Sequence, residues 1–99
     1  MSIDQNIYLG SFLFVGNTVK NLHQLMLDKL KDEDLFCFVE NQFLVPNRGR
    51  QGGIHINDSG VWEYPEKDFS HEDWKKIEIM LKEENITFEE KSGLIVWYN

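Results

Sequence analysis

The spacing of apolar side chains along the chain predicts strands interspersed with two helices. Ile7–Val15 is a run of β-branched and aromatic residues, which is typical of a buried strand. Over Val19–Lys31 and Ser70–Glu84 the apolar positions recur every three or four residues, the spacing of one helix face. Shorter apolar runs predict the remaining strands, which are Leu35–Val39, Phe43–Val45, Ile54–Asn57, Val61–Tyr64, Ile86–Glu90 and Leu94–Tyr98.

The second of these helices has the most complete set of end signals. Ser70 is a suitable N-cap, and Asp73, three residues later, occupies the capping-box position. Phe69 before the cap and Trp74 in the first turn are spaced for a hydrophobic staple. Asn85 can adopt the left-handed conformation that ends a helix. We therefore expect this helix to be well formed.

Turn residues separate the predicted strands. Asp58-Ser59-Gly60 is a hairpin signal between two short strands, and Lys91-Ser92-Gly93 predicts a second hairpin near the C-terminus. Gly10 is a candidate bulge inside the first strand. Asn17 or Thr18 can cap the first helix.

These elements follow one another in the order β-α-β-β-β-β-α-β-β, which predicts an α+β fold. Most strands are joined by short turns, so we expect a mostly antiparallel sheet of about six to seven strands with both helices packed on it. Leu94 to Trp97 is apolar at consecutive positions, which indicates a central strand covered on both faces. A chain of 99 residues makes a single domain, 1–99, with a core of its own.

Composition and charge narrow the classes of partner. The net charge is −7, and no basic stripe is present, which disfavours direct binding to nucleic acid. Acidity is suited instead to a partner with a basic surface, although it also serves solubility alone. No run approaches the ~20 apolar residues of a membrane-spanning helix, and the first residues lack the basic region of a signal peptide. We expect a cytoplasmic protein.

The reactive side chains do not form a catalytic pattern. Cys37 stands alone within an apolar run, so the sequence indicates a small buried hydrophobe rather than a nucleophile. His23, His55 and His71 are far apart and lack metal-ligand spacing. The serines have no nucleophile-elbow context. We expect no enzymatic activity, no cofactor and no metal.

One glycine-rich stretch, Pro46 to Pro65, differs from the rest of the chain. It contains both arginines, Arg48 and Arg50, and its first part, Asn47–Gly53, could wrap an anion with guanidinium and backbone N–H groups. The order of residues matches neither phosphate-binding glycine motif. A small-molecule or nucleotide-binding domain that uses the 47–53 loop, with His55 beside the ligand, is therefore the alternative hypothesis.

The leading hypothesis is a protein-interaction domain without catalysis. Arginine beside tryptophan and tyrosine is the combination that anchors many interfaces. In size and acidity alone, the chain resembles the inhibitor and immunity proteins of bacteria and their phages, which cover a site on a larger protein. Self-association through a sheet edge or through a Trp97/Tyr98 patch is a third hypothesis. The predicted partner-binding residues are Arg48, Arg50, Trp62 and Tyr64, with Asp32, Glu33 and Asp34 as a second, electrostatic surface.

Overall fold

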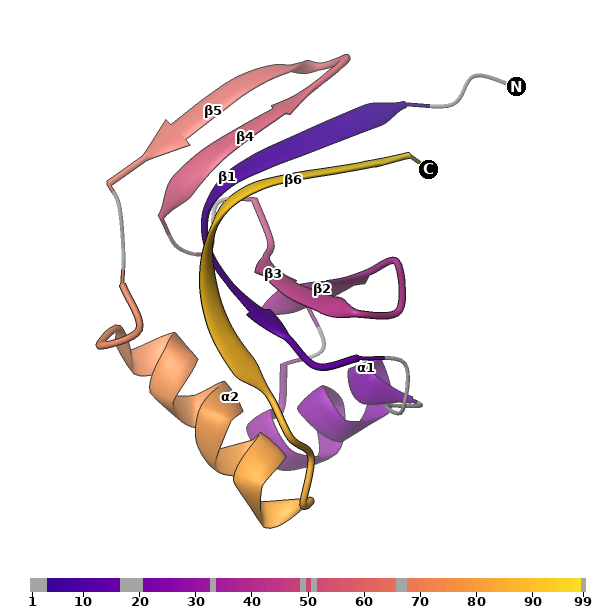
Figure 1. The fold of residues 1–99 in the computed structure, drawn as a ribbon, viewed down its shortest axis with the longest axis vertical. Coiled ribbons are helices and arrows are strands. Elements are labelled where there is room, and N and C mark those ends of the chain that lie inside the picture. Colours follow the sequence, from indigo (N-terminus) through magenta and orange to yellow (C-terminus); the bar gives the residue numbers. More distant parts are fainter. Residues whose placement is uncertain are drawn as a thin grey trace.

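The computed structural model describes residues 4–16, 21–32, 34–48, 50, 52–65 and 68–98. These residues form an antiparallel sheet of six strands with two helical segments, which confirms the predicted α+β class (Figure 1). In chain order the elements are β1 Gln5–Phe14, α1 Leu22–Leu25, η1 Met26–Leu30, β2 Phe36–Val39, β3 Phe43–Pro46, β4 Gly53–Asn57, β5 Gly60–Tyr64, α2 Glu72–Glu83 and β6 Glu89–Tyr98.

Strand β1 is the centre of the sheet and bends along its length. β6 pairs with one edge of β1 over ten residues. The other edge of β1 pairs with β4 near its start and with β3 near its end. The sheet therefore has an upper half, β5-β4 with the first part of β1 and the last part of β6, and a lower half, β2-β3 with the remainder of β1 and β6 (Figure 1).

The predicted C-terminal hairpin is wrong, because β6 is one continuous strand. Lys91–Gly93, predicted as a turn, lies within the ladder and pairs with β1. Gly93 has φ +149°, a conformation that favours glycine, and it faces Gly10 across the ladder. The long β1 partner provides the hydrogen bonds that keep this glycine segment extended. The predicted bulge at Gly10 is also wrong, since the register continues through it without a break.

The prediction that the last strand is central and covered on both faces is wrong as well. Within the described residues, β6 pairs only with β1 and forms an edge of the sheet. The side chains of Leu94 and Val96 are exposed, whereas Ile95 is buried. One face of β6 is therefore apolar without being covered.

The hairpin between β4 and β5 follows its sequence signal. The Asp58-Ser59 loop joins β4 and β5, with Asn57 opposite Gly60, as predicted. Glu40 and Asn41 both have φ +54°, the positive values of a type I′ turn, and they join β2 to β3.

The first helix is shorter than the predicted Val19–Lys31. It begins after Asn21 as α1, widens into the π-helical segment η1, and ends at Lys31, whose φ is +60°. The predicted caps Asn17 and Thr18 lie outside the described residues.

The second helix begins one residue later than predicted, with His71 as its N-cap in place of Ser70. The imidazole Nδ1 of His71 accepts a hydrogen bond from the backbone N–H of Asp73. Ser70 instead donates from its own N–H to the carboxylate of Asp68. Asp73 does not form the predicted capping box, because the cap has moved by one position and the imidazole now accepts from its N–H.

The rings of Phe69 and Trp74 are in contact, with 5.1 Å between their centroids. Because the cap is His71, these residues stand at N″ and N3 rather than at the N′ and N4 positions of the predicted staple. The end of the helix follows the prediction. Asn85 has φ +58° and follows the last turn.

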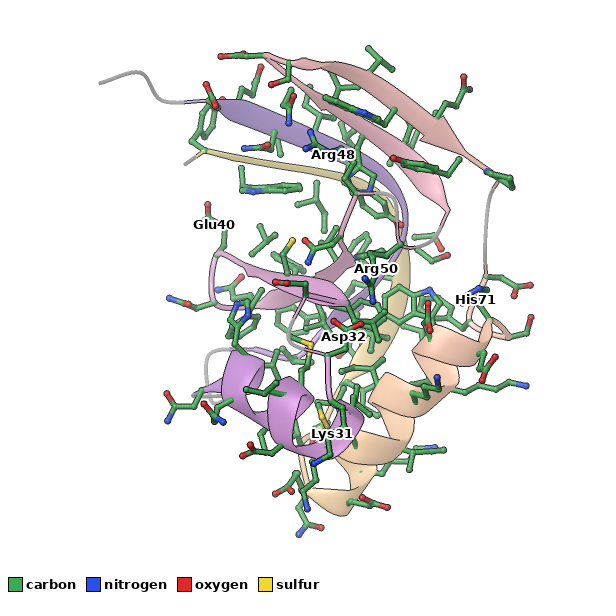
Figure 2. All side chains as sticks on the ribbon, turned by 180° about the vertical axis from the view of Figure 1, so that it is seen from behind. Lys31, Asp32, Glu40, Arg48, Arg50 and His71 are labelled. Atoms are coloured by element: carbon green, nitrogen blue, oxygen red, sulfur yellow. The ribbon has the colours of Figure 1, made fainter. Side chains whose placement is uncertain are left out.

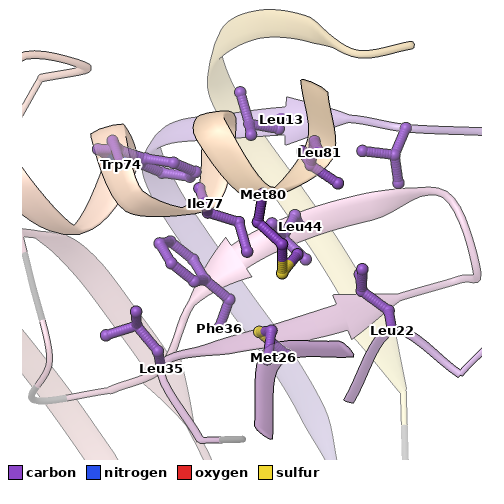
Figure 3. Packing of buried hydrophobic residues seen from close by; sticks show 11 residues of the cluster. Leu13, Leu22, Met26, Leu35, Phe36, Leu44, Trp74, Ile77, Met80 and Leu81 are labelled. Atoms are coloured by element: carbon purple, nitrogen blue, oxygen red, sulfur yellow. The ribbon is translucent and has the colours of Figure 1, made fainter. Parts of the chain in front are cut away.

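Both helices cover the lower half of the sheet, where the main hydrophobic core lies (Figures 1 and 3). Its buried residues are Leu13, Val15, Leu22, Met26, Leu35, Phe36, Leu44, Trp74, Ile77, Met80 and Leu81. A second, smaller cluster lies on the other side of the sheet, where the bend brings the two halves together, and consists of Tyr8, Phe12, Val39, Val45 and Ile95. We call this second side the inner side.

Candidate functional site

The aromatic residues predicted to bind a partner face the inner side of the sheet. Trp62 lies directly opposite His55 in the β4–β5 ladder and is half-buried, as is Tyr64. The guanidinium carbon of Arg48 lies 4.0 Å from the centroid of the Trp62 ring. The structure therefore brings Arg48 and Trp62 together, as predicted. They contact each other, however, and do not form a surface on which both side chains are free to bind a partner.

The second arginine and the acidic segment are also brought together. Arg50 forms an ion pair with Asp32, so these two charges neutralise each other at the surface (Figure 2). The backbone carbonyl of Asp34 accepts a hydrogen bond from the side chain of Asn47. Glu33 lies outside the described residues. The arginine loop and the acidic segment, predicted as separate surfaces, are thus neighbours.

A polar cleft lies beside Arg48 and Arg50. It has a volume of about 470 Å³ and is bounded by the segment after β3, the inner side of β4 and the end of β6. Among its lining residues are Asn6, Asp34, Asn47, Arg48, Arg50, His55, Asn57 and Trp97.

His55 is the buried titratable group of this cleft. Its side chain is 8% exposed, and its ring packs against Tyr8 with 4.8 Å between centroids. Burial, together with the positive charge of Arg48, lowers the pKa of His55 to about 4. Its Nε2 is buried and has no hydrogen-bond partner within the described residues. The imidazole is therefore neutral at physiological pH and keeps one hydrogen-bonding position unused.

Cys37 and the possible metal ligands are the remaining reactive groups. Burial raises the pKa of the Cys37 thiol to about 11, so little thiolate forms at neutral pH. In the part of the chain that the structure describes, no three His, Cys, Asp or Glu side chains come together as metal ligands do.

The opposite side of the upper half is a surface that was not predicted. Ile7 pairs with Ile56 and Val96, and Ile56 pairs with Val61, which forms one apolar row across four strands. A second row, formed by Leu94, Leu9 and Ile54, runs beside it. Tyr98 extends the patch along β6. We call this surface the outer sheet face; its apolar residues are Ile7, Leu9, Ile54, Ile56, Val61, Leu94, Val96 and Tyr98.

The outer sheet face is open to solvent in this structure. Val61, Leu94 and Tyr98 are 65%, 63% and 61% exposed. Figure 1 shows β4 and β5 at one end of the molecule and both helices gathered at the other. Trp97, the neighbour of Tyr98, points to the inner side and packs on the smaller cluster, so these two aromatic residues do not form the predicted joint patch.

Acidic side chains border this face. Glu63 follows Ile54 in the second row, and it is exposed. Asp4 and Asp58 lie close enough together that hydrogen bonding and repulsion between the two carboxyl groups raise the pKa of Asp4. Among the described residues no Lys or Arg forms an ion pair with these carboxylates, so the rim of the apolar patch is acidic.

A sequence signal for the outer sheet face was present but ambiguous. Ile7 and Leu9 flank the buried Tyr8, and Leu94 and Val96 flank the buried Ile95, so both faces of these strands are apolar. Such runs predict strands covered on both faces, and the sequence does not reveal that the helices reach only the lower half.

No protein-family model, curated protein or solved structure matches this chain. None of the helices in the described part is long and apolar enough to cross a membrane.

Proposed function

We propose that this chain is a small acidic protein-interaction domain that acts without catalysis, by covering a site on a larger protein with its outer sheet face. The observation that carries the proposal is the pair of apolar rows on β1, β4, β5 and β6. Like the inhibitor and immunity proteins that it resembles in size and acidity, it would work by occupying its partner's surface. Its single cysteine suits a reducing compartment, and we place it in the cytoplasm.

Leaving such a face uncovered is energetically unfavourable. Burying a Val, Leu or Ile side chain that was exposed is worth roughly 1.5–3 kcal/mol. Antiparallel sheets that meet water on one side usually carry polar residues there, whereas this face is mostly apolar. Contiguous apolar patches with polar rims mark interaction sites on soluble proteins. An exposed apolar face with a polar rim therefore favours a chain that binds a partner protein over one that stays alone in water.

The charge around the face indicates the chemistry of the partner. Glu63, Asp4 and Asp58 border the patch, and the whole chain carries a net charge of −7. A partner with an apolar centre and Lys or Arg at its rim would bury the rows and relieve the repulsion between the two aspartates. The proposed partner is therefore a larger protein with a basic-rimmed apolar patch.

This location differs from the surface predicted from sequence. Trp62 and Tyr64 are on the inner side, and Arg48 lies over Trp62, so they are separated from the outer sheet face by the sheet itself. A partner on the outer face would not contact them through their side chains.

Replacing exposed apolar residues by serine tests the proposal without touching the core. We expect the double variant Val61→Ser/Leu94→Ser to lose affinity for its partner by about 2 kcal/mol or more, roughly 30-fold. Affinity capture from the native host identifies the partner, and titration calorimetry with the purified partner measures the change. The matched control is Ile79→Ser, which removes an apolar side chain 57% exposed on α2, away from the face.

The binding results of the double variant and the control distinguish the outer sheet face from other surfaces. Loss of binding in the double variant alone, with an unchanged unfolding midpoint, supports the outer sheet face. Equal binding by the wild type and the double variant contradicts it. Light scattering on the wild type shows whether the protein that covers the face is instead a second copy of this chain.

A further inference from the structure

The polar cleft does not share the negative charge of the chain as a whole. Both arginines line it, and Asp34 is the one carboxylate among its described lining residues. The chain as a whole has a net charge of −7. A cluster of cationic and amide groups in so acidic a chain favours a small anion over a cation in this cleft.

The two arginines of the cleft are in different electrostatic states. Arg50 is neutralised by Asp32. The guanidinium of Arg48 lies over the ring of Trp62 instead, and within the described residues no carboxylate lies within ion-pair distance of it. Stacking uses the flat face of a guanidinium and leaves its N–H edge able to donate. Arg48 is therefore a positioned donor whose charge is not compensated.

His55 adds a second, independent sign of a ligand. It lines the cleft from β4, it is 8% exposed, and its Nε2 has no hydrogen-bond partner within the described residues. A buried polar atom without a partner is unfavourable, and such atoms are uncommon in folded proteins. A bound polar group in the cleft would provide that partner, because a neutral imidazole can donate to an oxyanion or accept from its hydroxyl.

We infer that this cleft binds the phosphate group of a small molecule, held by the N–H edge of Arg48 and by Nε2 of His55. A phosphate has several acceptor oxygens, and Arg48, Asn47 and Asn57 supply donor groups around one cleft. The volume of about 470 Å³ lies in the range of pockets that enclose a small organic ligand, and it exceeds the needs of a bare ion. The cleft also borders Ile7 and Ile56 of the outer sheet face. The inference does not rest on the proposed interaction, because its ligand groups, Arg48 and His55, are not part of the apolar rows of that face.

Nuclear magnetic resonance titration tests this directly on the whole chain. The probes are inorganic phosphate, adenosine 5′-monophosphate and adenosine, each added at constant ionic strength. We expect saturable shifts of the His55 imidazole and Trp62 indole signals with the phosphate-bearing probes and none with adenosine. Tighter binding of the monophosphate than of inorganic phosphate identifies a nucleotide-like ligand, and equal binding identifies the phosphate group alone.

Two variants locate the binding. Arg48→Gln leaves a shorter polar side chain at an exposed position and removes the charge and the guanidinium N–H edge, so we expect affinity to fall about tenfold or more. Lys29→Gln removes one positive charge at a distant surface site, where Lys29 pairs with Glu84, and should leave affinity unchanged. The absence of any saturable shift up to about 10 mM probe overturns the inference. So does wild-type affinity in Arg48→Gln.

Discussion

The buried imidazole of His55 makes a measurable prediction about stability and pH. Its pKa is lowered to about 4 in the folded protein, from an ordinary value of 6.5, by burial first and by the charge of Arg48 second. Between these two values the unfolded chain binds more protons than the folded one. The free energy of unfolding contributed by His55 is therefore lost as the pH falls through this window.

The size of the effect follows from the two pKa values. From about pH 6.5 to pH 4.5, the His55 contribution to the free energy of unfolding should fall by about 2 kcal/mol. Another group acts in the opposite direction. Burial and the nearby Glu90 raise the pKa of Glu78 to about 7, so its contribution increases as the pH falls over much of the same range. The wild-type profile alone cannot separate them.

Comparison with His55→Phe isolates the imidazole, because Glu78 is present in both proteins. Urea unfolding at several pH values should show that the wild type loses about 2 kcal/mol more than the variant on acidification. A direct titration of the imidazole by nuclear magnetic resonance should give a midpoint near 4, and Arg48→Gln should raise it. A midpoint near 6.5, with parallel stability profiles, would refute the buried, Arg48-facing placement of His55.

Two further predictions concern the bend of the sheet and the helix α2. At Gly53, which has φ +104°, a Cβ atom would lie 2.5 Å from Cε1 of Tyr8, so Gly53→Ala should destabilise the fold by more than about 2 kcal/mol. Gly93→Ala meets open space and should cost only the backbone strain, roughly 1–3 kcal/mol, which is less than strain and clash together cost at Gly53. Equal losses in the two urea midpoints would contradict this geometry. Glu78→Gln should increase the free energy of unfolding above neutral pH, where the wild type must ionise a carboxyl group beside Glu90. If the variant and the wild type show the same dependence of unfolding free energy on pH, the two groups do not interact.

The local elements were predictable because their signals lie within a few residues of each other. The Asp58-Ser59 hairpin and the contact between Phe69 and Trp74 depend on residues close in the sequence, and both occur. The cap of α2 moved by one residue because an imidazole at His71 accepted the hydrogen bond in place of a hydroxyl at Ser70. Such substitutions among capping groups cannot be resolved from propensity alone.

The long-range features were not predictable from the same signals. Lys91–Gly93 has the composition of a turn, and only the ten-residue pairing with β1 keeps it extended. The sequence predicted alternation in β4 and β5 but not which face meets the core. That choice depends on the bend of the sheet, which places His55 and Trp62 inside and Val61 outside. The candidate interaction surface therefore differs from the predicted one, although arginine and tryptophan do come together.

The most direct measurement is site-specific photo-crosslinking in the native host, with the crosslinking residue placed at Leu94 on the outer sheet face or at Ile79 on α2. Both side chains are exposed to a similar extent, 63% and 57%, so the two positions differ in location rather than in accessibility. We expect one discrete crosslinked protein from position 94 and none from position 79. A protein crosslinked equally from both positions, or from neither, would contradict the assignment of the outer sheet face as the interaction surface.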